Sequence, residues 1–172
     1  MVKEEKKERR GRRGRKKERE SEFEQRIVEI SRVTRVMAGG KRMRFRACVV
    51  IGDMKKRVAM ALAKGGDVTV AVNKAAKKAE KHMITVPIVN GTIPHAVRVK
   101  FKAAIVMLKP APQGTGVVAG GPTRAVAEMA GISNIVVKML GSNNKMNNVQ
   151  AMLIALERLH QPKVKSNGSK SS

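Results

Sequence analysis

Aromatic side chains are almost missing from this chain of 172 residues, which has three Phe and no Trp or Tyr. Proteins that read single-stranded RNA usually stack the exposed bases on aromatic rings. The composition therefore argues against a protein that recognises single-stranded bases in this way. Binding to structured RNA, or to a phosphate backbone in general, is still compatible with it.

The chain has one cysteine, Cys48, which excludes an internal disulfide framework and any metal site built from several cysteines. It lies in the apolar run 47–51, so we expect a buried and unreactive thiol. The histidines are dispersed as well, because His82, His95 and His160 have no ligand spacing to one another or to a cysteine or carboxylate. The sequence therefore predicts no metal site and no cofactor.

Acidic residues are scarce: 13 Asp and Glu stand against 37 Lys and Arg, which gives a net charge of +24. Positive charge is spread over both halves, with +9 on residues 21–90 and +6 on residues 91–161. A polyanionic partner is the natural compensation for such self-repulsion, so the charge predicts binding to nucleic acid. The stretch 129–156 has no acid at all, which leaves few candidates for general acid–base catalysis, and we do not expect an enzyme.

Hydrophobic residues make up 42% of the chain, enough to bury a core and to exclude a wholly disordered protein. We expect two domains, over residues 23–88 and 89–161, joined near the turn signal Asn90-Gly91. A disordered basic arm over residues 1–22 and a disordered tail over residues 162–172 are expected to flank them. No apolar stretch approaches the length of a membrane span, so we expect a cytoplasmic protein without membrane association.

The first half of the chain predicts three strands followed by a helix. Residues 23–37, 45–51 and 57–63 have the β-branched or alternating apolar residues typical of strands, although Ala and Met in the third would also suit a helix. Asp67 stands at the N-cap position of an amphipathic helix over residues 68–82. The order β-β-β-α and the length are close to those of a double-stranded-RNA-binding module, which recognises helix shape and phosphates.

The second half predicts the order β-β-α-β-α, which makes the whole chain an α+β protein. Gly131 fits the position just after the end of its first helix. The expected elements are strands over 95–101 and 103–108, a helix over 122–130, a strand over 134–140 and a helix over 146–159.

A glycine-rich loop at residues 114–121 precedes the first helix of the second half. Gly114, Gly116 and Ala119 match the pattern of a dinucleotide-binding loop, whose backbone amides hold phosphate at a helix N-terminus. Prolines interrupt the approach to this loop, and no acidic residue follows at the distance needed to bind a ribose. A tight loop that needs glycine for its backbone angles is the simpler interpretation, and amides that meet a nucleic-acid phosphate are an intermediate one.

Three basic stretches lie in the first half: residues 41–44, residues 55–57 and a lysine face over residues 74–81. A single run of this kind is usually a solvated surface. If residues 39–44 and 55–57 are turns of one sheet, however, several of their cations can meet phosphates.

From Phe23 to about His160 the chain resembles the bacterial small-subunit ribosomal protein S5 family. The resemblance is strongest in Lys109-Pro110-Ala111 and in the run Gly114-Thr115-Gly116-Val117-Val118-Ala119-Gly120-Gly121-Pro122. It departs from the family where Met54, Lys55 and Lys56 replace a glycine-rich turn, and where Lys145 replaces a frequent proline. The other matching motifs are residues 32–34, 39–42, 49–53, 86–87, 91–95, 124–126, 130–132 and 141–144.

This resemblance implies a double-stranded-RNA-binding-like first domain and a second domain with a left-handed β-α-β crossover. It also implies a structural role in the small ribosomal subunit, with no catalysis and no small-molecule substrate. The implied partners are small-subunit ribosomal RNA, the neighbouring small-subunit proteins four and eight, and messenger RNA near its path into the subunit, where the family supports decoding accuracy.

The charge pattern and the resemblance together select two sets of candidate residues. The candidate protein-interface residues are Gly114, Thr115, Gly116, Gly120, Gly121 and Arg124. The candidate RNA-binding residues are Arg35, Gly39, Gly40, Lys41, Arg42, Arg44, Lys55, Lys56, Arg57, Lys64, Lys109, Asn143 and Asn144. Two alternatives stay open: a structured-RNA-binding regulator outside the ribosome, and a nucleotide-dependent enzyme that uses the glycine-rich loop.

Overall fold

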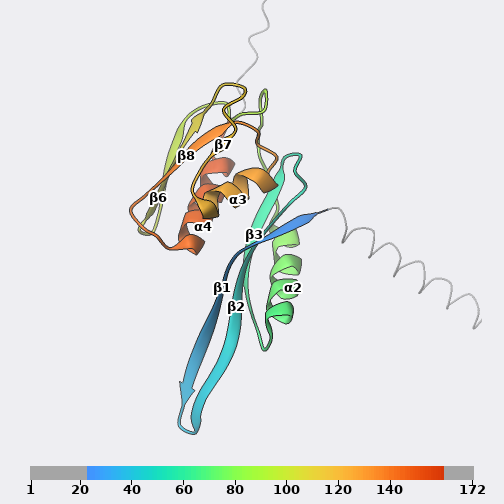
Figure 1. Cartoon of the computed structure of the whole chain (residues 1–172), viewed down its shortest axis with the longest axis vertical. Coiled ribbons are helices and arrows are strands. Elements are labelled where there is room, and N and C mark those ends of the chain that lie inside the picture. The colour runs from blue at the N-terminus through green and yellow to red at the C-terminus, as the bar shows by residue number, and fades with distance from the viewer. Residues whose placement is uncertain (1–22, 161–172) are drawn as a thin grey trace, which may run out of the picture.

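A computed structural model of the chain describes residues 23–160. The predicted arm over residues 1–22 and the tail over residues 162–172 lie outside this range. The described part has two four-stranded sheets, with strand orders β1-β2-β3-β4 and β5-β6-β8-β7. One sheet lies in each half of the chain, and helices α3 and α4 of the second half lie between the second sheet and the first (Figure 1).

The first sheet is antiparallel throughout. Its strand β3 spans residues predicted as a strand or a helix, and the structure confirms the strand. Asp67 caps α2 as predicted, because its carboxylate accepts a hydrogen bond of 2.7 Å from the amide of Val68. The elements are β1 (Glu24–Met37), β2 (Gly40–Gly52), β3 (Arg57–Gly65), α2 (Val68–Ala79), the 3-10 helix η1 (Glu80–His82) and β4 (Ile84–Thr85).

Helix α2 covers one face of this sheet through small side chains. Ala71, Ala75 and Ala79 of the helix are fully buried against a strand face that includes Ala47 and Val49. Alanines on both sides allow the helix to approach the sheet closely, and burial of this apolar surface fixes the helix to it. Cys48, on the same strand, is 1% exposed. Burial, with a smaller contribution from Glu29, raises the pKa of its thiol to about 11, which fits the expected inert cysteine.

Strands β1 and β2 continue well beyond the rest of the first sheet. Strand β3 pairs with β2 only from Phe45 onward, so the segment from residue 33 to residue 44 is a two-stranded ribbon. Figure 1 shows this hairpin extending away from the rest of the first sheet and from the second sheet. Met37 pairs with Gly40, so the turn is limited to residues 38 and 39. Residues 40–44, considered above as part of a turn over residues 39–44, therefore lie in strand β2.

The second sheet carries both remaining helices. Strand β7 pairs in parallel with β8, and α3 connects them, which gives a β-α-β unit. Strand β7 was not predicted, because two residues flanked by glycine-rich turns show no periodicity. The elements are β5 (Val97–Phe101), β6 (Ala104–Pro110), β7 (Val117–Val118), α3 (Gly121–Met129), β8 (Ile135–Leu140) and α4 (Lys145–Glu157).

The two halves share one core. Val50 and Val58 of the first sheet belong to the same buried cluster as Val126, Met129 and Leu156 of the second half. Backbone contacts reinforce the junction, since the amide of Met54 donates a 3.1 Å hydrogen bond to the carbonyl of Met129. The first sheet is therefore packed against α3 and α4 and is not merely tethered to them.

The turn predicted at Asn90-Gly91 is present and is attached to the second sheet. Both residues have positive φ, and the carbonyl of Gly91 accepts hydrogen bonds from the amides of Ser133 and Asn134. Within residues 23–160 no helix is both long and apolar enough to cross a membrane.

Candidate nucleic-acid interface

The register of the β1–β2 hairpin sorts its cations onto two faces. Residues directly opposite each other in an antiparallel pair project to the same side. Arg35 lies opposite Arg42, Val33 opposite Arg44 and Ser31 opposite Arg46. The resulting arginine face consists of Arg35, Arg42, Arg44 and Arg46. The opposite face of the hairpin holds Arg32 and Lys41, together with Thr34, Val36 and Met43.

The arginine face carries unbalanced charge. Like charges directly opposite on a sheet are destabilising, and Arg35 and Arg42 are such a pair. Among residues 23–160 the cations that pair with carboxylates are Arg26, Arg57 and Arg124, so none belongs to this face. The arrangement costs stability in the isolated chain, and an anion placed over the face would recover that cost.

Lys64 extends the arginine face toward the body of the protein. It lies directly opposite Arg46 in the β2–β3 ladder and is exposed. Arg46 is held by a 3.1 Å hydrogen bond from its Nε to the hydroxyl of Ser31. Arg46 was absent from the predicted set, and only the strand register could have identified it.

The second basic site is the tight turn between β2 and β3. One carboxylate oxygen of Asp53 accepts hydrogen bonds of 2.9, 3.0 and 2.8 Å from the amides of Lys55, Lys56 and Arg57. The other accepts a 2.7 Å hydrogen bond from Nε of Arg57. Desolvation opposes ionisation here, but the bonds from Arg57, Lys56 and Lys55 outweigh it and hold the pKa of Asp53 well below its usual range.

This network makes the turn a rigid support for exposed cations. The guanidinium of Arg57 also lies 5.2 Å from the centre of the Phe23 ring, a cation–π contact that fixes it from the other side. Lys55 and Lys56 are exposed on the turn. Met54 has a φ of 54°, so it adopts the left-handed conformation for which glycine would be better suited.

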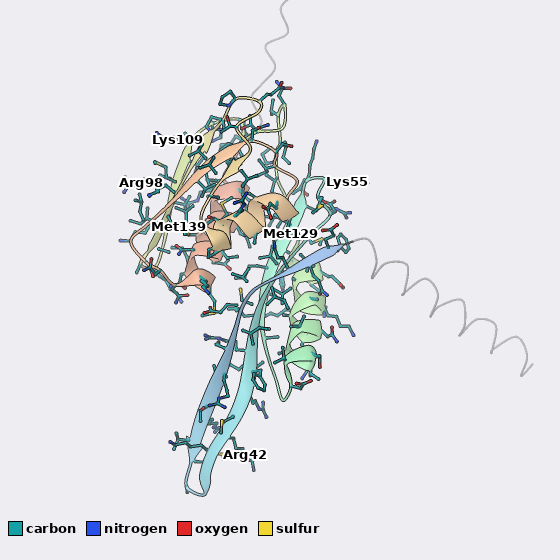
Figure 2. The ribbon with its side chains drawn as sticks, viewed as in Figure 1. Arg42, Lys55, Arg98, Lys109, Met129 and Met139 are labelled. Carbon is teal, nitrogen blue, oxygen red and sulfur yellow. The ribbon has the colours of Figure 1, made fainter. Side chains whose placement is uncertain are left out.

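The two basic sites are far apart. Figure 2 shows Arg42 near the tip of the hairpin and Lys55 toward the opposite end of the first sheet. Thirteen residues of β2 separate the two ends, which at roughly 3.3 Å per residue corresponds to about 40 Å. Residues 39–44 and the turn at residues 55–57 therefore lie at opposite ends of the first sheet.

The remaining predicted RNA-binding residues lie in the second half. Lys109 is exposed near the end of β6. Asn144 is the N-cap of α4, and its side-chain oxygen accepts hydrogen bonds from the amides of Met146 and Asn147. That oxygen already has a structural role, and Asn143 lies beside it in the exposed loop before the helix.

The glycine-rich loop is organised by a residue that the sequence analysis did not select. The side-chain oxygen of Asn134 accepts hydrogen bonds of 3.1 and 3.0 Å from the amides of Gly114 and Gly116. The amide of Thr115 donates to the carbonyl of Pro112. These three amides are thus used inside the chain, which favours the tight-loop interpretation over a phosphate cradle. No motif in the sequence indicates the role of Asn134, because its contacts with the loop are formed only in the folded chain.

Arg124 belongs to an ion-pair network that joins the two halves of the protein through Glu128. Its Nε lies 3.0 Å from a carboxylate oxygen of Glu128, and the other oxygen of Glu128 pairs with Arg26 of β1. The Arg124 side chain is nevertheless 56% exposed. These three residues line a groove of about 630 Å³, which Lys145 also lines. Arg26 and Glu128 thus join β1 to α3, and Arg124 pairs with Glu128 within the helix.

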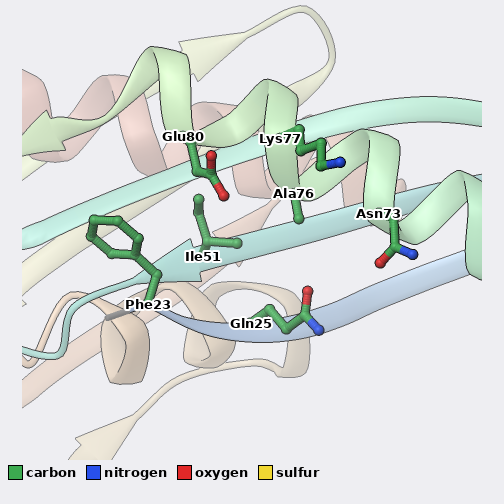
Figure 3. Close-up of a pocket in the computed structure, with 7 residues that line it drawn as sticks. All are labelled: Phe23, Gln25, Ile51, Asn73, Ala76, Lys77 and Glu80. Carbon is green, nitrogen blue, oxygen red and sulfur yellow. The ribbon is translucent and has the colours of Figure 1, made fainter. Parts of the chain in front are cut away.

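A second cavity lacks the features of an active site. It has a volume of about 390 Å³ and lies between the start of β1 and helix α2 (Figure 3). Lys77 and Glu80 are its ionisable residues, and no histidine, cysteine or serine lines it. Within residues 23–160, moreover, no three His, Cys, Asp or Glu side chains are grouped as metal ligands.

Together these features define a basic, two-sheet α+β protein with exposed cations on a long hairpin. Residues 23–87 match the model of the ribosomal protein S5 N-terminal domain, and residues 99–168 match that of the C-terminal domain. The chain belongs to the ribosomal protein S5 family.

Several curated relatives are named small ribosomal subunit protein uS5. The protein of Thermus thermophilus is 46% identical over 140 residues, which are 81% of this chain and 86% of the relative. That of Treponema pallidum (strain Nichols) is 42% identical and covers 82% of both chains. That of Mycoplasmopsis agalactiae is 49% identical over 84% of this chain, which spans only 63% of the relative's length.

Proposed function

We propose that this chain is a structural constituent of the small ribosomal subunit in the cytoplasm, and that it binds small-subunit ribosomal RNA. The names of its relatives support the first part. The net charge of +24 and the arginine face support the second. Binding would neutralise backbone phosphates without base stacking, because the chain has almost no aromatic residues.

The arginine face is the observation that carries the RNA-binding proposal. Arg35, Arg42 and Arg44 project from the part of the hairpin that β3 does not pair with. A two-stranded ribbon is narrow enough to enter a groove or lie along a backbone, and its opposed arginines need an anion between them. The basic turn at residues 55–57 would then contact RNA some distance away.

A pair of matched variants tests this proposal. Arg35→Gln with Arg42→Gln removes two charges from the arginine face, whereas Arg32→Gln with Lys41→Gln removes two from the opposite face. We expect the first variant to lower the slope of log K against log salt concentration for small-subunit ribosomal RNA by about 1.4–1.8. The second variant should lower this slope less. An equal fall in slope for both variants would contradict the assignment of the RNA contact to the arginine face.

The alternative of a regulator outside the ribosome predicts different behaviour in a cell lysate. A structural constituent should sediment with small subunits on a density gradient at moderately high salt. A free regulator should remain near the top while the subunits stay intact. This measurement does not depend on the choice of hairpin residues.

We also propose that the glycine-rich loop and Arg124 contact a neighbouring protein, and that the chain contacts proteins four and eight. Val118, in the middle of this region, is 51% exposed although it is a large apolar residue, as is common at interfaces. Val118→Asp should reduce binding to protein four.

The proposed position near the path of messenger RNA, and the support of decoding accuracy, follow from the family. If they hold for this chain, Val118→Asp should also change the frequency of miscoding in a translation assay. An unchanged frequency would contradict that part of the proposal.

A further inference from the structure

The second sheet has a face that no element of residues 23–160 covers. Helices α3 and α4 pack on its inner side, where Val99, Val106 and Val137 are buried. The alternate residues of the same strands project outward. Figure 2 shows Arg98 and Lys109 along the side of this sheet that lies away from the helices.

The strand register places these outward residues in rows. In the central row Arg98 of β5 lies beside Met107 of β6, which lies beside Lys138 of β8. Lys100 lies two residues from Arg98, and Lys109 lies two residues from Met107. Two strand spacings separate the backbones of Arg98 and Lys138, or about 9.6 Å, and two residues along a strand add about 6.7 Å. We call Arg98, Lys100, Lys109 and Lys138 the outer cationic face.

The outer cationic face has positive charges and no negative charges in its strands. All four cations are exposed, and none pairs with a carboxylate in the described part of the chain. Strands β5, β6, β7 and β8 contain no Asp or Glu. The apolar residues between the cations, Ile105 and Met107, are only partly exposed, and the exposed Val118 lies at the β7 edge of the face, so charge dominates its centre.

We propose that the outer cationic face binds the phosphate backbone of RNA, as a second contact surface separate from the hairpin. This inference rests on the proposed function, since it assumes that the chain meets RNA. Four cations without an acid complement a polyanion, and the absence of an outward aromatic residue leaves backbone contact rather than base stacking. A typical protein interface would instead have a more exposed apolar centre and fewer lysines.

The test removes all four charges in the full-length chain, as Arg98→Gln, Lys100→Gln, Lys109→Gln and Lys138→Gln together. The probe is purified small-subunit ribosomal RNA, and affinity is measured between 50 and 200 mM salt. Loss of four phosphate contacts should lower the slope of log K against log salt concentration by about 3. Raising the salt from 50 to 200 mM should therefore weaken RNA binding by the variant about 60-fold less than it weakens binding by the unchanged protein. The circular dichroism spectrum should not change, because all four side chains are exposed.

A matched control separates local contact from the general loss of charge. It carries Gln in place of Lys74, Lys77, Lys78 and Lys81, which also removes four charges. The proposal requires a larger fall in slope for the outer-face variant than for this control. An equal or smaller fall would overturn it.

Three further outcomes distinguish this proposal from the proposed function. If Arg35→Gln with Arg42→Gln weakens RNA binding but the outer-face variant equals its control, this inference fails and the proposed function stands. If none of the variants changes binding, both fail. If the outer-face variant keeps its RNA affinity but no longer sediments with small subunits, the face meets a protein, and the choice of RNA is overturned.

Acetylation of lysines tests the same surface independently, in the protein without substitutions. RNA should protect Lys100, Lys109 and Lys138 from an amine-reactive reagent. Unchanged modification of all three in the complex would overturn the proposal.

Discussion

The junction between the two halves should be sensitive to one added methyl group at Gly131. This residue has a φ of +77°, and a Cβ there would lie 2.0 Å from the carbonyl oxygen of Met54. Ordinary contact begins near 3.4 Å, so the two backbones would have to separate by about 1.4 Å. Such a shift would strain the hydrogen bond from Met54 to Met129.

The expected magnitude comes from comparison with Gly116. That residue has a similar φ of +72° but nothing within 4 Å of an added Cβ, so Gly116→Ala introduces only backbone strain, about 1–2 kcal/mol. Gly131→Ala adds the clash, and overpacking of this kind costs about 1–3 kcal/mol. We expect Gly131→Ala to be more destabilising than Gly116→Ala by about 2 kcal/mol. Gly39 has neither a positive φ nor an atom within 4 Å of an added Cβ, so Gly39→Ala should change the free energy of unfolding little.

Denaturant and thermal unfolding followed by far-ultraviolet circular dichroism would measure these differences, because the chain has no Trp or Tyr for fluorescence. A difference of about 2 kcal/mol corresponds to roughly 4–8 °C in Tm for a protein of this size. Equal destabilisation by Gly131→Ala and Gly116→Ala would refute the close approach of the β2–β3 turn to α3.

Three other predictions concern buried or ion-paired groups. Asn134→Ala should cost about 2 kcal/mol and speed hydrogen exchange of the two glycine amides that it binds, whereas unchanged exchange would exclude this role. Asp53→Asn should cost about 1–2 kcal/mol at pH 7. Because folding lowers the pKa of Asp53, its contribution is present above the unfolded value of about 3.9 and is lost as the pH falls through the folded value, so the variant should lose less stability below about pH 4. Cys48, with a pKa of about 11, should react with iodoacetamide at pH 8 at least about 100-fold more slowly than in the unfolded chain, and a fast reaction would contradict its burial.

Much of the fold could be predicted because its signals are local. Alternating apolar residues indicated β1, β2 and β3, since side chains alternate between the faces of a strand. Asp67 and Gly131 marked helix ends through hydrogen bonds and backbone angles within a few residues. The excess of cations over acids is a property of composition, so the expectation of a polyanionic partner needed no structure.

The candidate sites depended on contacts between distant residues. A turn limited to residues 38 and 39 sets the pairing of β1 with β2, and that pairing places Arg35 and Arg42 on one face. A turn one residue longer on one strand would have moved one of them to the other side. The outer cationic face likewise exists only because three strands align their rows.

What the sequence determined by itself is therefore the type of most elements, their order and the sign of the surface charge. Tertiary structure decided that the two basic stretches of the first half lie far apart, that Asn134 closes the glycine-rich loop and that β7 forms at all. The physical reason is the range of the interactions. Periodicity and capping act within a few residues, whereas register, sheet pairing and side-chain hydrogen bonds across about twenty residues are settled only when the chain packs.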